Sequence, residues 1–411
     1  MDTSSDIFQS RLYRLNRTLL SLLGQWPFQK DRYRRVIIVT TSFIGLTQAL
    51  TQVLALVTLR GDFDALIECA PPLIVDGVCI IKLTTLICNV EKLKMLLVHI
   101  QRDWRSWTIK SEFEILSRFA ESGRSITIGY ASGMYAFGSL FPLLAIIPKI
   151  IGKNVTSDYA TRPVGFPYHV EYYIDLEKYY YPVLIHNYLT TAIRLTTIVA
   201  FDTYVAILVQ HCCALFSVVR YRLEYIRKSI EQDKELTLLQ EDDKFYKNFV
   251  YCIQKHKDAL RFARCLDMVY TKAFFIEVGF VILAMSLSAL QATSGTLNPH
   301  LAVRHAAYII AQLLHLYIAC WLGQQMIDHS NRVYTSTYRG EWYESPPKSR
   351  KLLNMIMMRS ISPCTLTVGK IMVLSLPSFS AVRPVIIFFI QSFSIRYVIV
   401  SLLLAKFYFL F

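Results

Sequence analysis

Long apolar runs separated by shorter polar segments organise this 411-residue chain. Seven of these runs are long enough to form membrane-spanning helices, because the hydrocarbon core of a bilayer requires about 20 apolar residues. They lie at about Val36–Leu59, Leu66–Val90, Ile126–Ile151, Pro182–Val219, Ala273–Ala292, Val303–Met326 and Leu374–Leu404. The pattern therefore predicts an all-α polytopic membrane protein with seven transmembrane helices.

The polar segments between the runs mostly carry amphipathic helical patterns. Leucines at helical spacing in residues 1–35 predict an amphipathic helix on the membrane surface, and residues 91–124 and 219–272 predict helices outside the bilayer. Because the run at Pro182–Val219 is longer than a bilayer requires, we expect one continuous helix that projects beyond the membrane. The predicted organisation is an N-terminal segment, 1–35, helices one to six, 36–326, a polar and then amphipathic segment, 327–365, and the last helix, 366–411.

Composition agrees with a membrane location. Apolar residues make up 54% of the chain and charged residues only 18%, whereas soluble proteins contain about 25% charged residues. The net charge of +14 does not indicate nucleic-acid binding, because the basic residues lie in short segments between apolar runs and form no continuous patch. The nine cysteines have no Cys-x-x-Cys spacing, so we expect them to be buried small hydrophobic side chains.

Basic residues are distributed very unequally between two sets of polar segments. The segments 1–35, 91–124, 219–272 and 326–365 hold 32 Lys and Arg residues, and the alternate segments hold 6. Because cytoplasmic loops are enriched in Lys and Arg, the N-terminus is predicted to be cytoplasmic and the C-terminus, after seven crossings, extracellular. Residues 152–182 then form an outer loop, which contains the glycosylation acceptor Asn154-Val155-Thr156.

Ionisable residues inside the apolar runs are candidates for function. Asp76, Arg194, Asp202 and Glu277 all lie within predicted spans. A charge at mid-bilayer costs at least about 2.5 kcal/mol, so these side chains should face the protein interior. Two interpretations stay open: the groups face an aqueous vestibule or ligand pocket, or they form structural ion pairs between helices, which we favour. Lys82 lies nearer the inner end of its run and is expected to reach the interface.

Motifs for catalysis are missing from the sequence. It contains no Gly-rich phosphate loop, no Gly-x-Ser-x-Gly and no His-Glu-x-x-His, so we expect no enzyme activity and no cofactor. His211 precedes Cys212-Cys213, but adjacent residues on a helix point about 100° apart and no second ligand set converges on them. We therefore expect no metal site.

The residues after Ser362 contain the most specific motif in the chain. Leu366-Thr367-Val368-Gly369-Lys370 is followed by Ser375-Leu376 and Phe379. Upstream positions occur in matching order and spacing, namely Tyr338, Trp342, Pro346, Pro347, Arg350, Leu353, Met358, Arg359 and Pro363. This run resembles the C-terminal motif of the insect odorant receptor family.

The resemblance implies a receptor subunit in the plasma membrane of olfactory sensory neurons. Such a subunit would form a ligand-gated, non-selective cation channel as a heterotetramer with the shared odorant co-receptor, opened by a small volatile or hydrocarbon ligand. Residues 327–365 would be a cytoplasmic anchor segment that contributes to subunit contacts, and the last helix would line the pore. Two alternatives remain, a gustatory-type homotetrameric receptor channel and a G-protein-coupled receptor, although the latter has the opposite orientation in the membrane.

The resemblance also assigns candidate sites. It places the ligand pocket in the outer halves of predicted helices two, three, four and six, which offer Leu73, Ile74, Gly77, Tyr135, Phe137, Phe141, Tyr188, Leu189, Ala192, Tyr308 and Gln312. For each single residue, helix packing or lipid contact is the alternative role. Ser375, Ser378, Val382 and Ile386 lie three or four residues apart and are the candidate pore face, since hydroxyls hydrate ions and apolar rings gate by dewetting. The alternative for these four is a packed helix interior.

The resemblance ends after about Val382. The chain continues with Arg383-Pro384, and a proline in the middle of a pore helix would kink it. Because Val-Arg can be encoded by GTAAGA, which matches the start of an intron, we hypothesise that residues from about 382 onward are unspliced intron. A mature transcript that encodes Arg383-Pro384 would refute this hypothesis.

Overall fold

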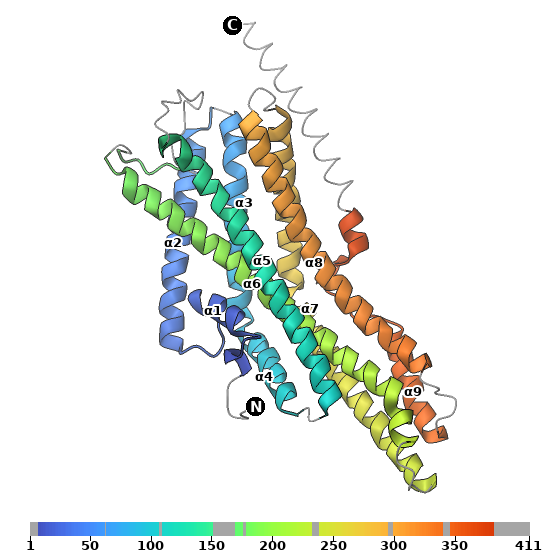
Figure 1. The fold of residues 1–411 in the computed structure, drawn as a ribbon. Coiled ribbons are helices and arrows are strands. Elements are labelled where there is room, and N and C mark those ends of the chain that lie inside the picture. Colours follow the sequence, from blue (N-terminus) through green and yellow to red (C-terminus); the bar gives the residue numbers. More distant parts are fainter. Residues whose placement is uncertain are drawn as a thin grey trace.

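A computed structural model describes the backbone of residues 7–61, 63–106, 109–150, 169–175, 178–231, 238–294, 299–339 and 346–381, and the side chains of most of them. Within these ranges the chain is almost entirely helical (Figure 1). The helices are η1 (Ile7–Gln9), α1 (Arg14–Leu22), α2 (Asp31–Thr58), α3 (Phe63–Cys88), α4 (Val90–Ser106), α5 (Lys110–Ile150), α6 (Tyr180–Glu231), α7 (Leu238–Ser294), α8 (Pro299–Arg339) and α9 (Pro347–Ser360). Strands β1 (Thr367–Val368) and β2 (Met372–Val373) form an antiparallel hairpin.

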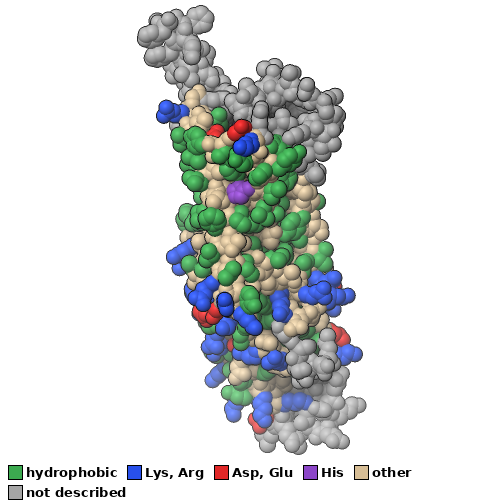
Figure 2. All heavy atoms as spheres, turned by 90° about the vertical axis from the view of Figure 1, so that its left-hand side faces the viewer, with side chains coloured by type: hydrophobic (Ala, Val, Ile, Leu, Met, Phe, Trp, Pro, Cys, Tyr) green, Lys and Arg blue, Asp and Glu red, His purple; other side chains and the backbone are tan. Residues whose placement is uncertain are grey.

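The long helices α2, α3, α5, α6, α7 and α8 form an elongated bundle in which α6 runs obliquely to α2 (Figure 1). Helices α1, α4 and α9 lie toward one end of the bundle, which we call the basic end because Lys and Arg side chains gather there (Figure 2). Helix α6 is central and packs against α5, α7 and α8. Between Val199 and Val219 nearly every α6 residue is buried, as expected for a helix that is apolar on all sides.

Five helices are long and apolar enough to cross a membrane by length and composition: α2, the part of α3 from Cys69, α6, α7 and α8. They coincide with five of the predicted spans. The third predicted span lies in α5, where side chains from residue 140 onward are outside the described set, and most of the seventh lies beyond residue 381. The seven crossings and their orientation therefore stay predictions.

The predicted spans are longer as helices than as apolar runs. Helix α6 has 52 residues, or about 78 Å at 1.5 Å per residue, which confirms the prediction that the fourth run continues beyond a bilayer. Helix α7 begins within the polar segment 219–272 and runs without a break through the fifth span. Helix α5 likewise begins at Lys110, inside the segment that we expected to precede the third span.

The N-terminal segment packs onto the bundle, and α1 lies against α5 and α6. Phe8, Leu20 and Trp26 are buried, and the Asn16 amide donates a hydrogen bond to Thr127 Oγ1 of α5 at 3.2 Å. The amphipathic pattern of this segment is therefore explained by burial against protein on one side. The opposite side stays open, since 61% of Leu22 is exposed.

Helix α4 is held to the bundle by a buried carboxylate. Asp103 Oδ2 lies 3.1 Å from His211 Nε2 of α6 and 3.4 Å from His99 Nε2, and both the Asp103 and His211 side chains are 1% exposed. Burial alone would raise the pKa of the Asp103 carboxyl, but the hydrogen bond from His211 and the neighbouring His99 and Lys255 hold it below the ordinary value. The partner of His211 is thus a carboxylate from another helix.

We expect Asp103→Ala to lower the free energy of unfolding by about 3 kcal/mol, because removing one partner of a buried pair leaves the other without compensation. Thermal unfolding of detergent-solubilised protein at neutral pH measures the loss. Since the folded-state pKa of Asp103 is lowered, its contribution is complete above the ordinary pKa of about 4 and is lost as the pH falls through the folded value.

Asp258→Ala is the control, because the Asp258 side chain is 28% exposed and lies 3.7 Å from Arg102. A partly exposed pair of this kind contributes at most about 1 kcal/mol. Equal losses in the two variants would contradict the assignment of Asp103 as the main polar attachment of α4.

Candidate functional site

Lys82 of α3 lies in the protein interior, and the prediction that it reaches the membrane interface is wrong. Its side chain is 1% exposed, and its Nζ lies 2.5 Å from Asp202 Oδ1 of α6 and 2.5 Å from Glu277 Oε1 of α7. The ammonium also lies over the Phe201 ring, 4.4 Å from its centre. Two carboxylates from neighbouring helices hold the lysine inside because together they replace the water that it would otherwise need.

His315 and Tyr130 complete this group of polar side chains. His315 Nε2 of α8 lies 2.8 Å from Glu277 Oε1, and the Tyr130 hydroxyl of α5 donates a hydrogen bond to Asp202 Oδ2 at 2.7 Å. The same hydroxyl lies 2.8 Å from His315 Nδ1. Lys82, Tyr130, Asp202, Glu277 and His315, which we call the charged cluster, therefore join five helices.

The hydrogen bonds of the charged cluster determine the protonation of His315. Tyr130 donates its one proton to Asp202, so His315 Nδ1 must donate to the Tyr130 oxygen for that contact to be a hydrogen bond. His315 Nε2 faces a carboxylate oxygen of Glu277 and must also donate. A doubly protonated His315 satisfies every contact and gives the cluster two positive and two negative charges.

Asp202, Glu277 and His315 also have the ligand types of a cation site, since their ligand atoms lie within 4.8 Å of one another. The ammonium of Lys82 already lies against both carboxylates at 2.5 Å. The arrangement therefore fits an internally compensated ion cluster better than a metal site. This supports the interpretation that we favoured, structural ion pairs between helices, for Asp202 and Glu277.

A second buried ion pair joins α3 to α6. Arg194 Nη2 contacts Asp76 Oδ2, and Gln52 of α2 bridges the pair when its amide is turned to donate to Asp76 at 3.1 Å and accept from Arg194 at 2.8 Å. All three residues are less than 9% exposed. Asp76 and Arg194 thus also fulfil the structural ion-pair interpretation.

The candidate ligand residues lie on several faces of the bundle. Gly77 lies at a close approach of two helices, since a Cβ there would be 2.8 Å from Phe280 Cε2 of α7. The Tyr135 hydroxyl donates a hydrogen bond to Thr196 Oγ1 at 3.0 Å, and 47% of Leu189 is exposed. Helix packing therefore explains Gly77. The exposed side chain of Leu189 fits the alternative role, contact with lipid.

The remaining ligand candidates are partly buried or outside the described side chains. Leu73, Ile74, Phe137, Tyr188, Tyr308 and Gln312 are half-buried, and Ala192 is exposed. The side chain of Phe141 lies outside the described residues, as does Asn154. Tyr308 and Gln312 are one turn apart on α8, and His315 of the charged cluster follows on the next turn.

The Leu366-Thr367-Val368-Gly369-Lys370 motif forms the β1–β2 hairpin, which the sequence reading did not predict. Gly369 and Lys370 both have φ of 61°, and Ile371 N donates to Val368 O at 3.1 Å. Positive φ at both central residues is the signature of a type I′ hairpin turn, for which glycine is favoured. The signal for this turn in the sequence was Gly369, with the β-branched residues Thr367 and Val368 before it and Ile371 and Val373 after it.

The hairpin is attached to one face of α7. Thr367 donates hydrogen bonds from its N and Oγ1 to Asp267 Oδ1, both at 2.7 Å, and Gly369 N donates to Thr271 O at 2.9 Å. A Cβ on Gly369 would lie 2.8 Å from the Phe275 ring. Asp267, Thr271 and Phe275 are four residues apart, so the hairpin lies along a single helical face.

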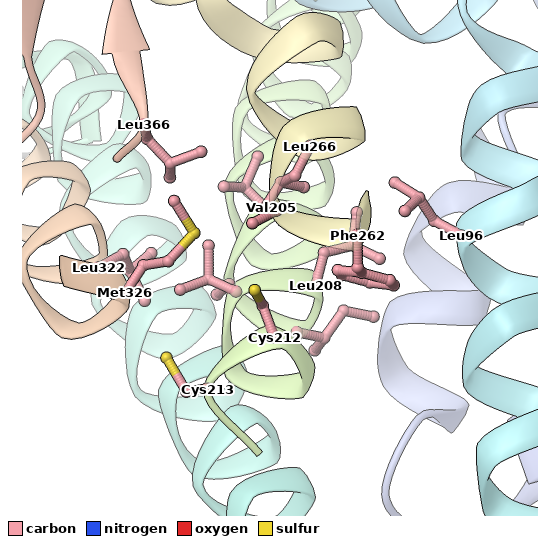
Figure 3. Packing of buried hydrophobic residues seen from close by; sticks show 14 of the residues in the cluster. Leu96, Val205, Leu208, Cys212, Cys213, Phe262, Leu266, Leu322, Met326 and Leu366 are labelled. Carbon is pink, nitrogen blue, oxygen red and sulfur yellow. The ribbon is translucent and has the colours of Figure 1, made fainter. Parts of the chain in front are cut away.

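Helix α8 holds the other side of the hairpin. Leu366 is 1% exposed and points into the core beside Leu322 and Met326 of α8 (Figure 3). A Cβ on Gly323 would lie 2.8 Å from Leu374 Cβ and closer still to the Leu374 carbonyl oxygen. Gly323 is therefore required for the close approach of the chain that leads into the last helix.

The last helix begins at Leu376, directly after the hairpin. Ser375 Oγ accepts a hydrogen bond from Ser378 N at 3.2 Å and lies 2.8 Å from Ser378 Oγ, which is the geometry of an N-terminal cap. Of the four candidate pore residues, Ser375 and Ser378 are thus engaged in capping at this position. Val382 and Ile386 lie outside the described residues.

We expect Lys82→Met to lower the free energy of unfolding by roughly 3–5 kcal/mol, because it leaves two buried carboxylates with His315 as their one remaining counter-charge. The triple variant Lys82→Met, Asp202→Asn, Glu277→Gln should recover part of the loss. Lys272→Met is the control, since Lys272 of α7 is exposed. Thermal unfolding in detergent measures all three. A single variant as stable as the control would contradict the role of Lys82.

A family model described as 7tm Odorant receptor matches residues 62–385. Among curated proteins, the chain is 28% identical over 128 residues to Odorant receptor 67a of Drosophila melanogaster, covering 31% of each chain. It is 22% identical over 133 residues to the Odorant receptor coreceptor of Aedes aegypti, covering 32% of this chain and 28% of that one. Odorant receptor 45a of Drosophila melanogaster is 23% identical over 236 residues, covering 57% and 58%. Each match spans less than two thirds of the relative's length.

Solved structures show the same fold. The insect olfactory receptor OR5 from Machilis hrabei in complex with eugenol matches with a TM-score of 0.77 and 13% identity, covering 94% of this chain and 99% of that chain. A second structure of the same receptor matches with a TM-score of 0.74 at 13% identity. Because the family model covers most of the chain and the fold agrees, the chain belongs to the odorant receptor family, a family of receptors and not of enzymes.

Proposed function

We propose that the protein is an odorant or pheromone receptor subunit that forms, with the shared odorant co-receptor, a heterotetrameric ligand-gated non-selective cation channel. Family membership and the similarity to the coreceptor of Aedes aegypti support this proposal. The observation that carries it is the hairpin fixed to α7 and α8, because the last helix begins directly after it at Leu376. A helix anchored at one end to the bundle is suited to transmit a change in the bundle to a pore.

In this proposal the basic end of the bundle is cytoplasmic. The polar segments with 32 of the Lys and Arg residues belong to this end, and the segments with 6 belong to the other. Residues 327–365, which include α9, serve as the cytoplasmic anchor segment between subunits. Asn154 lies in the outer loop and is available for glycosylation, and the C-terminus is extracellular. The subunit is a multi-pass protein of the plasma membrane in olfactory sensory neurons.

The ligand is a small volatile or hydrocarbon molecule bound between helices in the half of the bundle away from the basic end. Such molecules require an apolar site with a few polar groups. On α8, Tyr308 and Gln312 precede His315 by two turns and one turn. A ligand that contacts these two side chains therefore acts on the helix that the charged cluster ties to α5 and α7.

Ligand binding opens the pore only if the open state binds the ligand more tightly. The last helix, with Ser375, Ser378, Val382 and Ile386 as its pore face, is the element whose position differs between the two states. Ser375 and Ser378 lie at its capped first turn, and in this proposal they are near the mouth of the pore. OR5 of Machilis hrabei, which shares this fold, was solved in complex with eugenol.

We expect odour-evoked cation currents when the subunit is co-expressed with the co-receptor and tested against a panel of volatile compounds. Excised patches without G-protein activity measure them, and the currents should persist there, which distinguishes a channel from a G-protein-coupled receptor. If the subunit gives equal currents without the co-receptor, the homotetrameric channel is the correct alternative and the heterotetramer is wrong. No current with any ligand, from a pair that reaches the cell surface, would contradict the proposal.

We expect Gly323→Ala to reduce the odour-evoked current at least tenfold while the co-expressed pair still reaches the surface. The added methyl group would collide with the backbone and side chain of Leu374, and overpacking of this kind costs about 1–3 kcal/mol. Gly279→Ala on α7 is the matched control, because a Cβ there meets no atom within 4 Å. A normal current from Gly323→Ala would show that the contact between Gly323 and Leu374 is not part of gating.

A further inference from the structure

Helix α2 carries a continuous stripe of exposed apolar side chains. Its members are Val36, Val39, Phe43, Leu46, Leu50, Val53 and Val57, each between 45% and 67% exposed. The spacing alternates between three and four residues, so the stripe follows one face of the helix over its length. Helix α2 lies at the edge of the bundle in Figure 1, and Figure 2 shows many apolar side chains on that side of the molecule above its basic end. This stripe faces the lipid if α2 crosses the membrane.

The same face becomes basic one turn before the stripe begins. Arg32 lies four residues before Val36, and Arg35 lies four residues before Val39, so each occupies the same side of the helix as its apolar partner. Both arginines are exposed, and Tyr33 between them is 64% exposed. Arg35 directly precedes Val36 and Arg32 lies about one turn further back, so both arginines lie at the level of the phospholipid headgroups when the stripe faces lipid.

The N-terminal segment extends this surface sideways. Gly24, with φ of 67°, packs so closely on α2 that a Cβ would lie 2.7 Å from the Arg34 carbonyl oxygen and 3.1 Å from Ile38 Cγ1. This contact places the chain after α1 beside the first turns of α2. Leu22 and Phe28, which flank that contact in sequence, are 61% and 42% exposed. Apolar and basic side chains thus meet at the same level, as in interfacial membrane-binding segments.

The basic side chains of this surface have no ionic partners among the described residues. Lys30, Arg32 and Arg35 are exposed, and none of them makes an ion pair within the part of the chain that the structure describes. Asp31 is the one acidic residue in the first turn of α2. By contrast, Arg11 and Arg124 both contact Glu121. The three cations beside α2 are therefore available to an external anion.

We propose that Lys30, Arg32 and Arg35, with Tyr33, Leu22 and Phe28, form a site for anionic phospholipid headgroups in the leaflet at the basic end. The guanidinium groups bind headgroup phosphate, because their donors match its oxygens bidentately. The exposed rings and Leu22 insert beside the acyl chains. The proposal rests on the membrane crossing of α2 in the proposed function. Clusters of Lys and Arg next to a membrane helix are suited to such lipids, each residue contributing about 1 kcal/mol.

The choice of a lipid over a soluble anion follows from the apolar neighbours. A free phosphate or inositol phosphate would use only the cations, whereas a phospholipid also covers Leu22, Phe28 and the first residues of the α2 stripe. The lipid therefore buries apolar surface that a soluble anion leaves exposed to water, and should bind more tightly.

The test uses the purified full-length chain in detergent micelles, with phosphatidylinositol 4,5-bisphosphate or phosphatidylserine added against a background of phosphatidylcholine. Native mass spectrometry measures how much of each lipid stays bound. We expect Arg32→Gln, Arg35→Gln together to weaken retention of the anionic lipids roughly 30-fold, since two basic residues are lost. Retention of phosphatidylcholine should not change.

Arg60→Gln is the matched control, because Arg60 is exposed beyond the other end of α2. It should retain the anionic lipids as the unmodified chain does, and Arg32→Lys, Arg35→Lys should retain most of the binding, which separates charge from misfolding. Unchanged retention in the double glutamine variant, or an equal loss with Arg60→Gln, would overturn the proposal. Equally tight binding of soluble inositol trisphosphate would replace the lipid by a free anion.

This measurement needs neither the co-receptor nor an odour-evoked current. A chain that binds anionic lipid through Arg32 and Arg35 but carries no current with the co-receptor would contradict the proposed function and leave the lipid site in place. A chain that carries an odour-evoked current with the co-receptor but does not bind anionic lipid through Arg32 and Arg35 would contradict the lipid site alone.

Discussion

The interior of this receptor depends on a lysine ammonium buried between two carboxylates. Transfer of each charge from water into a helical bundle costs several kcal/mol, and only close, hydrogen-bonded partners compensate for it. Lys82, Asp202 and Glu277 come from three helices, and Tyr130 and His315 add two more. The rotation and depth of all five helices are therefore coupled, because turning any one of them by a residue, about 100°, removes a partner from a buried charge.

Helices α7 and α8 both contribute residues to the charged cluster and both hold the hairpin. On α7, Phe275 contacts the hairpin turn and Glu277 of the cluster follows two residues later. On α8, His315 and Gly323 are eight residues apart, or about 12 Å along the helix. Packed interiors change between discrete arrangements and do not deform continuously. In the proposed function, a displacement of α7 or α8 at the cluster would reach the start of the last helix through directly packed residues.

The N-terminal segment and α2 together form a surface of exposed apolar and basic side chains at the basic end of the bundle. At the basic end the N-terminal segment folds back along α5 and α6, so its apolar side is covered by protein while Leu22 and Phe28 stay exposed beside cations. Helix α2 touches the rest of the bundle sparsely and presents one face outward along its length. In the proposed function α2 crosses the membrane, and its apolar stripe with Arg32 and Arg35 at the start of that stripe would set its depth in the bilayer, while α3 and α6 pack against it.

The sequence by itself determined the helical class, the positions of the long apolar runs and the presence of charges that had to be paired in the interior. Those features are local, because hydrophobic periodicity and the cost of a charge in lipid act on each segment independently. It did not identify Lys82 as an interior residue, because its partners are 120 and 195 positions away in the chain, and it gave no sign of which carboxylate meets which cation. The hairpin made from Leu366 to Leu374 was likewise decided by tertiary structure, since Asp267, Thr271 and Gly323 supply its hydrogen bonds and its space. Only the packing of distant helices brings these groups within hydrogen-bond distance, and one apolar run read alone carries no information on its neighbours.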